Sequence, residues 1–224
     1  FVRVCGPRFE PRREGVQRFV FASTCSNYGK MADSSGYVKE ESGLSPLSVY
    51  AETKVAVEKA LLAASPHDNP KVTVLRFASI FGLSPRMRFD LTVNEFTMEL
   101  LTKRKLTVYG KQFWRPYIHV RDAARAIAMV LEAPEEKVKG QVFNVGDTSQ
   151  NHQKGQLIEL ICAKIGDCVE IEYLDKEEDP RDYRVSFDKI KRTLSFRNTR
   201  AVEDGIGEVV DAINAQYREQ PDQD

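Results

Sequence analysis

Residues 18–29 form a short apolar run that ends in a cluster of hydroxyl side chains, Arg18-Phe19-Val20-Phe21-Ala22-Ser23-Thr24-Cys25-Ser26-Asn27-Tyr28-Gly29. A run of this length, rich in aromatic and β-branched residues, predicts a buried strand of a parallel sheet. Hydroxyls at the carboxyl end of such a strand lie where open α/β sheets bind ligands. The stretch therefore predicts an α/β fold with a ligand site at the end of this strand.

A Tyr-x-x-x-Lys pair follows in the segment Val49-Tyr50-Ala51-Glu52-Thr53-Lys54. Residues four apart on a helix lie on one face, one turn from each other. Tyrosine is a poor base at neutral pH, but a nearby ammonium stabilises the phenolate and makes proton transfer accessible. The pair alone is weak evidence, because Tyr and Lys also occur at this spacing on solvated helices. Its position after the predicted strand strengthens the catalytic interpretation.

Strands alternate with helices along the rest of the chain. A helix is predicted from Ser45-Pro46 to about Ala64 and a strand over 72–77, which implies a right-handed parallel crossover from the first strand. Apolar periodicity predicts further helices over 92–102, 120–131, 155–165 and 201–217, and strands over 106–109 and 141–145.

Composition excludes several classes of function. The 33 acidic and 33 basic residues balance, so there is no electrostatic reason to expect binding to nucleic acid or to a membrane surface. No apolar stretch approaches the ~20 residues of a membrane span. The four cysteines, Cys5, Cys25, Cys162 and Cys168, lack the spacing of metal ligands. We therefore expect reduced thiols, no metal site and a cytoplasmic location.

Further motifs follow in order: Leu75-Arg76-Phe77-Ala78-Ser79-Ile80-Phe81-Gly82, Trp114-Arg115-Pro116-Tyr117-Ile118-His119-Val120-Arg121-Asp122, Phe143-Asn144-Val145-Gly146 and Arg181-Asp182-Tyr183-Arg184. From about Val16 to Gly207 the chain resembles the extended short-chain dehydrogenase/reductase family, in particular its NAD-dependent sugar-nucleotide epimerases and dehydratases. The resemblance implies a partial Rossmann-like parallel sheet with a smaller α+β part. The dinucleotide-binding part would comprise residues 1–80 and 111–147, and the nucleotide-sugar part residues 81–110 and 148–224.

One family motif is absent from the sequence. Family members open with a strand, a Gly-rich turn and a helix that hold the NAD pyrophosphate, and none of the thirteen glycines here forms such a turn. Residues 1–15, with Pro7 and Pro11, do not resemble the helix expected there. The chain is then either part of a longer protein or a truncated relative without a competent NAD site, and the sequence leaves both open.

The resemblance also implies roles for individual residues. Tyr50 would remove a proton from a sugar hydroxyl, Lys54 would hold the nicotinamide ribose, and Thr24 would hydrogen-bond the reacting oxygen. The alternative for Thr24 is a strand-end hydroxyl that caps local backbone. Tyr50 and Lys54 are also predicted to bind NAD, together with Ser23, Phe77 and Ile80, and Asn94, Arg115 and Arg181 (or Arg184) are predicted to bind the substrate diphosphate. Surface charge is the alternative for each arginine, and for His119 we expect a structural hydrogen bond.

The residues after Thr24 separate the subfamilies. Family dehydratases carry Asp-Glu there, and this chain has Cys25-Ser26; enzymes that epimerise beside a keto group use a cysteine where this chain has Ser26. By resemblance, the remaining catalytic set of Thr24, Tyr50 and Lys54 suffices for an NAD-dependent nucleotide-sugar 4-epimerase. A reductase or dehydratase of the same family and a non-catalytic sugar-nucleotide-binding remnant stay open. A homodimer through the Tyr50 helix is expected by resemblance.

Overall fold

The centre of the fold is a three-stranded parallel sheet of order β1-β2-β6 in a computed structural model that describes residues 15–31, 36–64, 71–166, 169–175 and 182–219. Its strands are β1 (Arg18–Thr24), β2 (Lys71–Phe77) and β6 (Gln141–Val145), and both pairings are parallel. The predicted α/β class with a parallel sheet is thereby confirmed.

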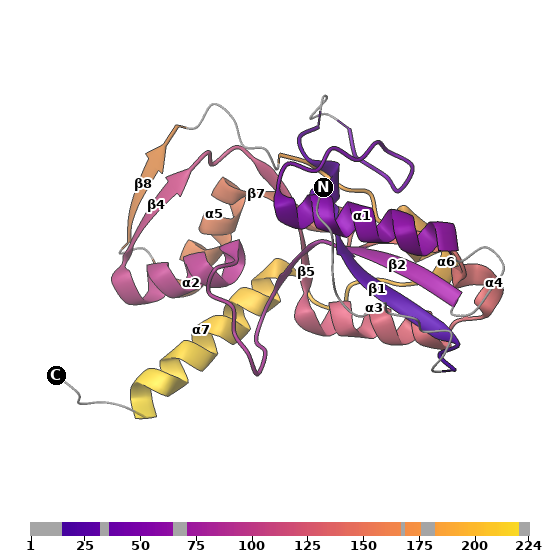
Figure 1. The fold of residues 1–224 in the computed structure, drawn as a ribbon. Helices are drawn as coiled ribbons and strands as arrows, with labels where there is room; N and C mark the ends of the chain where they lie inside the picture. The colour runs from indigo at the N-terminus through magenta and orange to yellow at the C-terminus, as the bar shows by residue number, and fades with distance from the viewer. Residues whose placement is uncertain (1–14, 32–35, 65–70, 167–168, 176–181, 220–224) are drawn as a thin grey trace.

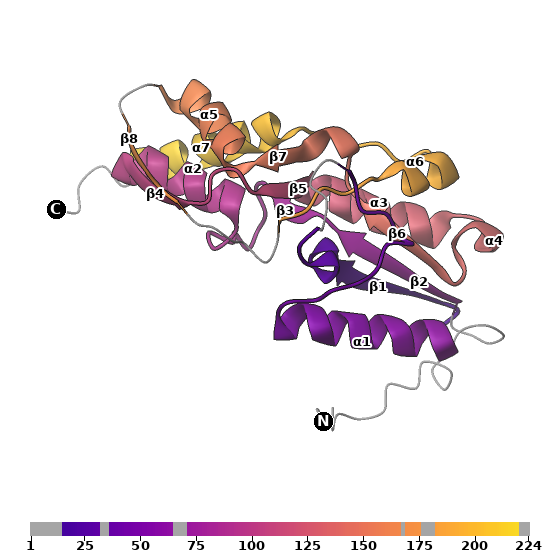
Figure 2. The same cartoon turned by 90° about the horizontal axis from the view of Figure 1, so that it is seen from above.

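Helices cover both faces of this sheet. Figure 2 shows α1 (Val49–Ala64) on one face and α3 (Val120–Glu132) on the other. The central strand β2 is consequently buried from Val72 to Phe77, as expected for a continuous apolar run between two helical layers. Strand β1 is only half-buried, because within the described residues it pairs on one side alone, with β2.

A second group of elements lies beside the sheet, on the left of Figure 1. Helices α2 (Thr92–Lys103), α5 (Lys154–Ile165) and α7 (Val202–Glu219) pack against one another and enclose their own hydrophobic cluster. Two small sheets accompany them: β3-β5-β7, formed by Ser79–Phe81, Trp114–His119 and Asn151–Gln153, and β4-β8, formed by Lys105–Tyr109 and Glu170–Leu174. The short elements are η1 (Cys25–Tyr28), α4 (Glu135–Val138), η2 (Thr148–Gln150) and α6 (Asp188–Leu194).

The hydrophobic cluster around the central sheet draws on late parts of the chain. Side chains of the segment 182–196 pack into it, namely Tyr183, Val185, Phe187, Ile190, Leu194 and Phe196. The domain limits implied by the resemblance, 1–80 with 111–147 and 81–110 with 148–224, stay a prediction.

The predicted start of the Tyr50 helix is wrong by a few residues. Helix α1 begins at Val49, where the Ser48 hydroxyl accepts a hydrogen bond from the Ala51 N–H at 3.2 Å. Ser45 instead belongs to the preceding loop, and its N–H donates to the Asn27 carbonyl at 3.0 Å. A serine cap thus overrides the Ser-Pro signal upstream.

His119 has the structural role expected of it. Its Nδ1 accepts from the Arg121 N–H at 3.2 Å and caps α3, while Nε2 lies 2.9 Å from a Glu208 carboxylate oxygen on α7. Gly82 approaches this ring so closely that an added Cβ would lie 2.2 Å from His119 Nε2. The imidazole therefore joins the end of β3 to α7.

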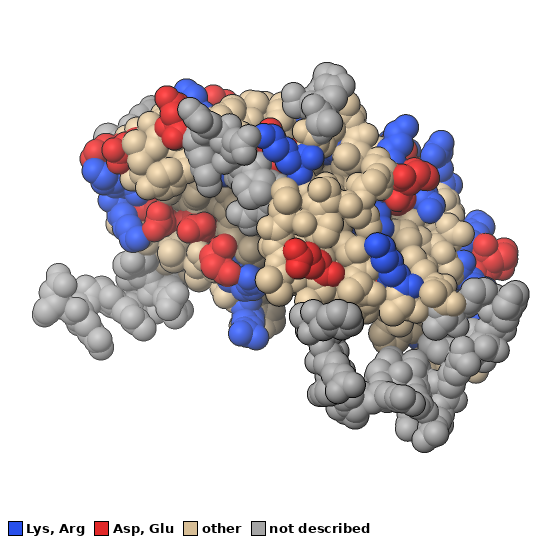
Figure 3. Space-filling model, turned by 45° about the horizontal axis from the view of Figure 1, so that its top comes forward, with Lys and Arg blue, Asp and Glu red and all other residues tan. Residues whose placement is uncertain are grey.

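Charge on the surface is mixed. The face drawn in Figure 3 carries basic and acidic side chains interspersed over a largely uncharged ground. None of the helices in the described ranges has the length and apolarity needed to cross a bilayer.

Candidate active site

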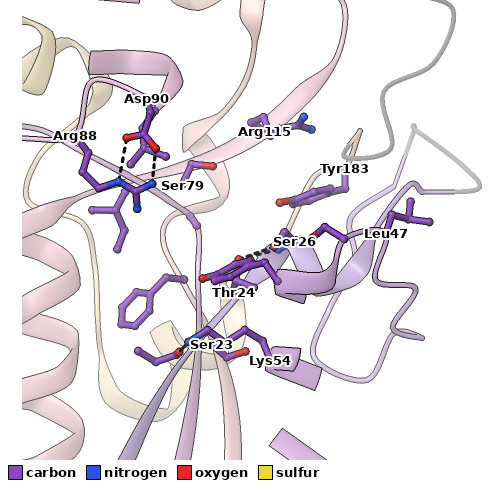
Figure 4. A pocket seen from close by; sticks show the side chains of 17 residues that line it. Ser23, Thr24, Ser26, Leu47, Lys54, Ser79, Arg88, Asp90, Arg115 and Tyr183 are labelled. Atoms are coloured by element: carbon purple, nitrogen blue, oxygen red, sulfur yellow. Dashed lines mark hydrogen bonds and ion pairs between the residues drawn. The ribbon is translucent and has the colours of Figure 1, made fainter. Parts of the chain in front are cut away.

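A cavity of about 750 Å³ opens at the carboxyl ends of β1 and β2, next to the start of α1. Figure 4 shows the side chains around it. Its lining is Ala22, Ser23, Thr24, Ser26, Leu47, Ser48, Tyr50, Lys54, Phe77, Ala78, Ser79, Ile80, Arg88, Asp90, Leu91, Arg115 and Tyr183. A cavity of this size is in the range that takes a small organic ligand. Hydroxyls at a strand end thus mark a cavity, as the sequence indicated.

Tyr50 and Lys54 lie together on the α1 wall of the cavity. The Lys54 ammonium is 5.7 Å from the centre of the Tyr50 ring, and it donates to the Ala22 carbonyl at 2.8 Å. Its Nζ also lies 4.9 Å from the centre of the Phe21 ring. The Tyr50 side chain is half-exposed toward the opening. The structure therefore places a phenol and an ammonium of one helix face beside the end of β1.

Thr24 lines the same cavity and also caps the chain that follows it. Its Oγ1 accepts from the Ser26 N–H at 3.1 Å and lies 2.9 Å from the Ser26 hydroxyl. The local cap considered as the alternative is therefore present. The capping bond leaves Thr24 in the cavity wall, so one hydroxyl can serve both purposes.

The apolar side of the cavity comes from β2 and β3. Phe77, Ala78 and Ile80 line it, and Ser23 lies at the adjacent end of β1. The structure thus brings together all five residues predicted for NAD, since Tyr50 and Lys54 share this lining.

Ser23 belongs to a cluster of buried polar side chains. The two charged members of this cluster, Glu58 and Arg76, were not singled out from the sequence. We call Ser23, Asn27, Glu58 and Arg76 the Glu58 cluster. The Glu58 carboxylate accepts from Ser23 Oγ, from Asn27 Nδ2 at 2.9 Å and from Arg76 Nη2 at 2.7 Å. A signal was available, because Glu58 continues the four-residue spacing of Tyr50 and Lys54.

Hydrogen bonds extend from the Glu58 cluster across the sheet to Tyr28 and Asn144. Ser23, Arg76 and Asn144 are direct register partners on the three strands. Arg76 Nη1 donates to the Tyr28 hydroxyl at 3.0 Å, and that hydroxyl donates to Asn144 Oδ1 at 2.7 Å. Burial raises the pKa of Tyr28 far above its ordinary value, so this phenol stays protonated. Burial alone would lower the pKa of Arg76, but its bonds to Glu58 hold it above the ordinary range.

Arg115 reaches the cavity from β5 and is almost fully buried. Its guanidinium carbon lies 5.7 Å from the centre of the Tyr183 ring, and Nη1 donates to the Trp114 carbonyl at 3.2 Å. Tyr183, which also lines the cavity, was quoted as part of a motif but not proposed as a site residue. The nearby Arg184 lies with its guanidinium carbon 4.6 Å from the Tyr37 ring centre and 5.0 Å from that of Trp114.

Arg88 and Asp90 form an ion pair on the wall opposite Ser26 and Leu47 in the view of Figure 4. Arg88 Nη2 donates to Asp90 Oδ2 at 2.6 Å and Nε donates to Oδ1 at 3.0 Å. This pairing holds the pKa of the Asp90 carboxyl below its usual range. Within the described lining Asp90 carries the only carboxyl group.

One predicted substrate residue in the described ranges, Asn94, does not line this cavity. Asn94 is buried in the first turn of α2; its Oδ1 accepts from the Gly82 N–H and its Nδ2 donates to the Arg88 carbonyl, both at 3.1 Å. Its amide is committed to the loop, so its placement lends no support to a diphosphate contact. Arg181 lies outside the described residues.

Comparisons with known proteins identify the fold and its relatives. The chain is 28% identical to an uncharacterized UDP-glucose epimerase, YtcB, of Bacillus subtilis, over 92% of this chain and 64% of that protein. It is also 28% identical to a dTDP-glucose 4,6-dehydratase of Streptomyces griseus, over 88% and 59%. The crystal structure of a dTDP-glucose 4,6-dehydratase from Bacillus anthracis in complex with NAD superposes with a TM-score of 0.77 at 26% identity, covering 90% of this chain and 63% of that one.

The chain thus spans under two thirds of the length of these relatives. Residues 10–146 match the profile described as "NAD dependent epimerase/dehydratase family". This match covers more than half of the chain and includes the hydroxyl cluster after β1 and the Tyr50–Lys54 pair. The chain belongs to the NAD dependent epimerase/dehydratase family.

Proposed function

We propose that this protein is an NAD-dependent nucleotide-sugar 4-epimerase. The observation that carries the proposal is the convergence of Thr24, Tyr50 and Lys54 on one cavity at the strand ends. The relatives named as a UDP-glucose epimerase and a dTDP-glucose dehydratase support a nucleotide sugar as the substrate class.

The nicotinamide end of NAD fits the residues that line the cavity. Phe77, Ala78 and Ile80 offer an apolar wall for a planar ring, and the Lys54 ammonium can reach a ribose hydroxyl beside it. When bound, NAD supplies a reversible hydride acceptor. The chain's own contribution is to orient the sugar and to move one proton.

Tyr50 is the proton carrier in this proposal. It takes the proton of the sugar 4-hydroxyl as the carbon is oxidised, and it returns that proton when the carbon is reduced on its other face. Lys54, 5.7 Å from the Tyr50 ring centre, stabilises the negative charge that the phenol acquires. Thr24 donates a hydrogen bond to the same sugar oxygen, and its Oγ1 already lies among the cavity hydroxyls.

The carboxyl groups favour an epimerase over a dehydratase. Eliminating water from the sugar needs an acid and a base besides Tyr50, and a useful acid has a raised pKa. Asp90 is the one carboxyl in the described lining, and Arg88 lowers its pKa instead. Cys25 and Ser26, which stand where dehydratases of the family carry Asp-Glu, supply no carboxyl, and burial raises the pKa of the Cys25 thiol.

Self-association through α1 is part of the proposal. The outward side of this helix exposes Val49 and Val57 together with the small residues Ala56 and Ala60. An apolar face of this kind is suited to pairing with the same helix of a second copy. This would make the protein a homodimer.

The direct test is an equilibration assay. The full-length protein that contains this chain, given NAD and UDP-glucose or UDP-glucuronic acid, should produce the 4-epimer with no net loss of water. Proton nuclear magnetic resonance of the sugar distinguishes the epimer from a dehydrated or decarboxylated product. A 4-keto-6-deoxy product would contradict the proposal and identify a dehydratase.

Replacing Arg115 should weaken substrate binding more than chemistry. Arg115 approaches the cavity from β5, and a guanidinium matches a diphosphate in shape and charge. We expect Arg115→Gln to raise KM for the nucleotide sugar by about tenfold or more, which corresponds to a charge-assisted hydrogen bond of about 1.5–3 kcal/mol, with kcat changed far less. Steady-state kinetics measures both constants, and Arg121→Gln, on exposed α3 surface, is the control. A fall in kcat with KM unchanged would contradict this role.

A further inference from the structure

We propose that Glu58 is a positioning residue: through the Glu58 cluster it fixes where α1 lies on the strand ends and therefore where Tyr50 meets Thr24. Its catalytic consequence rests on the proposed function. The placement of α1 by Glu58 does not.

The first half of α1, which carries Tyr50, packs against the sheet through small apolar side chains. Ala51 and Val55 are its buried apolar residues, while Val49 is 73% exposed and Tyr50 58%. The larger Leu61 and Leu62 are half-buried and lie beyond Glu58. Dispersion and apolar burial are not directional, and small side chains interlock little with a sheet. The hydrogen bond from Lys54 to the Ala22 carbonyl is one directional contact of this half, but it is made at an exposed site, and a buried contact is needed to define how the helix is turned.

Glu58 supplies such contacts to three other elements of the fold. Its carboxylate is 1% exposed and accepts from Ser23 on β1, Asn27 on η1 and Arg76 on β2. Arg76 Nε adds two more contacts at 3.2 Å, one to each carboxylate oxygen. A shift of α1 by one residue moves it by about 1.5 Å and would break this set. Breaking it would leave a charge buried without its partner, which is strongly unfavourable.

The Glu58 cluster connects the two halves of the reacting site. Tyr50, Lys54 and Glu58 follow one another at four-residue spacing on the same face of α1. Ser23, which donates to Glu58, immediately precedes Thr24 on β1. The helix with the proton carrier is thus tied to the strand that carries the hydroxyl facing it.

A test compares Glu58→Gln with wild type in the full-length protein that contains this chain. The variant keeps the side-chain volume but loses the charge and an acceptor. Hydrogen exchange at the amides of Ala51 to Val55 should be faster, since this half of α1 is then held by small side chains and the exposed Lys54–Ala22 hydrogen bond. Nucleotide-sugar affinity, measured by calorimetry, should change by less than about threefold, because Glu58 does not line the cavity.

Single-turnover kinetics separates positioning from stability. With folded enzyme in saturating excess over UDP-glucose, the substrate fixes the amplitude, and the rate constant reports the geometry in each folded molecule whatever fraction of the enzyme is folded. We expect the rate constant to fall about 10- to 100-fold, because a misplacement near 1 Å can cost ~10²-fold. Glu58→Asp keeps the charge but withdraws it by one methylene, and it should show the same pattern to a smaller degree. It replaces the Gln variant if that variant does not fold.

Asp122→Asn is the matched control. Asp122 is as buried as Glu58 and accepts from Thr199 N–H, Arg200 N–H and Arg125 Nη2, all at 2.8–3.0 Å, outside the cavity lining. It should lower global stability and leave the rate constant and the exchange of Ala51 to Val55 near wild type.

Two results would overturn the proposal: an unchanged rate constant in Glu58→Gln, or an equal fall in Asp122→Asn. Absence of turnover in the wild-type protein would instead count against the proposed function. In that case the exchange measurement still decides whether Glu58 fixes α1, because wild-type protection in Glu58→Gln would refute it.

Discussion

Tyr50→Phe should reduce kcat by about 10³-fold or more, in line with the ~10²–10⁴-fold that a positioned acid–base group contributes. The substitution removes one oxygen, and with it the group that we propose takes and returns the sugar proton. The Tyr50 side chain is half-exposed, so its loss leaves no buried polar partner unsatisfied and the fold should be unaffected. Nucleotide-sugar binding, measured by calorimetry, should stay within about threefold of wild type.

The control for this variant is Tyr109→Phe. Tyr109 lies on β4, is exposed to a similar degree at 54% and does not line the cavity. It should turn over at the wild-type rate. Wild-type turnover by Tyr50→Phe would remove the mechanism, and loss of sugar binding in that variant would assign Tyr50 to recognition instead.

Arg76→Met should lower the free energy of unfolding by about 3–5 kcal/mol, the usual cost of removing one partner of a buried ion pair. Both side chains of the Arg76–Glu58 pair are nearly inaccessible, at 6% and 2% exposure, and their closest atoms are 2.7 Å apart. The variant leaves the Glu58 carboxylate buried without its cationic partner. The midpoint of thermal unfolding should fall by roughly 10 °C, given ~2–4 °C per kcal/mol for a chain of this size.

Two further variants sharpen that measurement. Lys103→Met removes the exposed ion pair with Glu99, which has a similarly short separation of 2.6 Å, and should change stability by less than about 1 kcal/mol. Combining Glu58→Leu with Arg76→Met should recover much of the loss, because no uncompensated charge is left inside. A cost below about 1 kcal/mol for Arg76→Met would show that water or another group compensates Glu58.

The sequence predicted the strands of the central sheet and the end of it at which the cavity opens. The runs at 18–23, 72–77 and 141–145 are apolar because helices cover both faces, and this burial makes such strands visible in a sequence. Helix α2 was expected over 92–102 and extends over Thr92–Lys103. The residues around the cavity were found for a different reason, which is that their motifs resemble those of a known family.

The remaining features depend on contacts between distant residues. Strand β8 has mostly exposed side chains and exists because it pairs with β4, 65 residues earlier at the Lys105–Glu170 pair, so its own pattern is weak. In the sequence, Glu58 is one of many charged residues on predicted helices. Its burial is evident only from the structure, which places Arg76 opposite it. Asn94 was assigned to a ligand by resemblance, whereas the structure shows its amide bonded to backbone at both ends of a loop.

The two hydrogen bonds of Asn94 determine which part of this loop can vary. The Asn94 side chain ties Gly82 to Arg88, so the residues between them form a closed excursion whose ends are fixed from α2. Arg88 lines the cavity, whereas Pro85 and Arg86 at the tip of this excursion are not among its lining residues. The tip of this loop can therefore vary in sequence and length while its two anchored ends, and with them Arg88 in the cavity wall, keep their places.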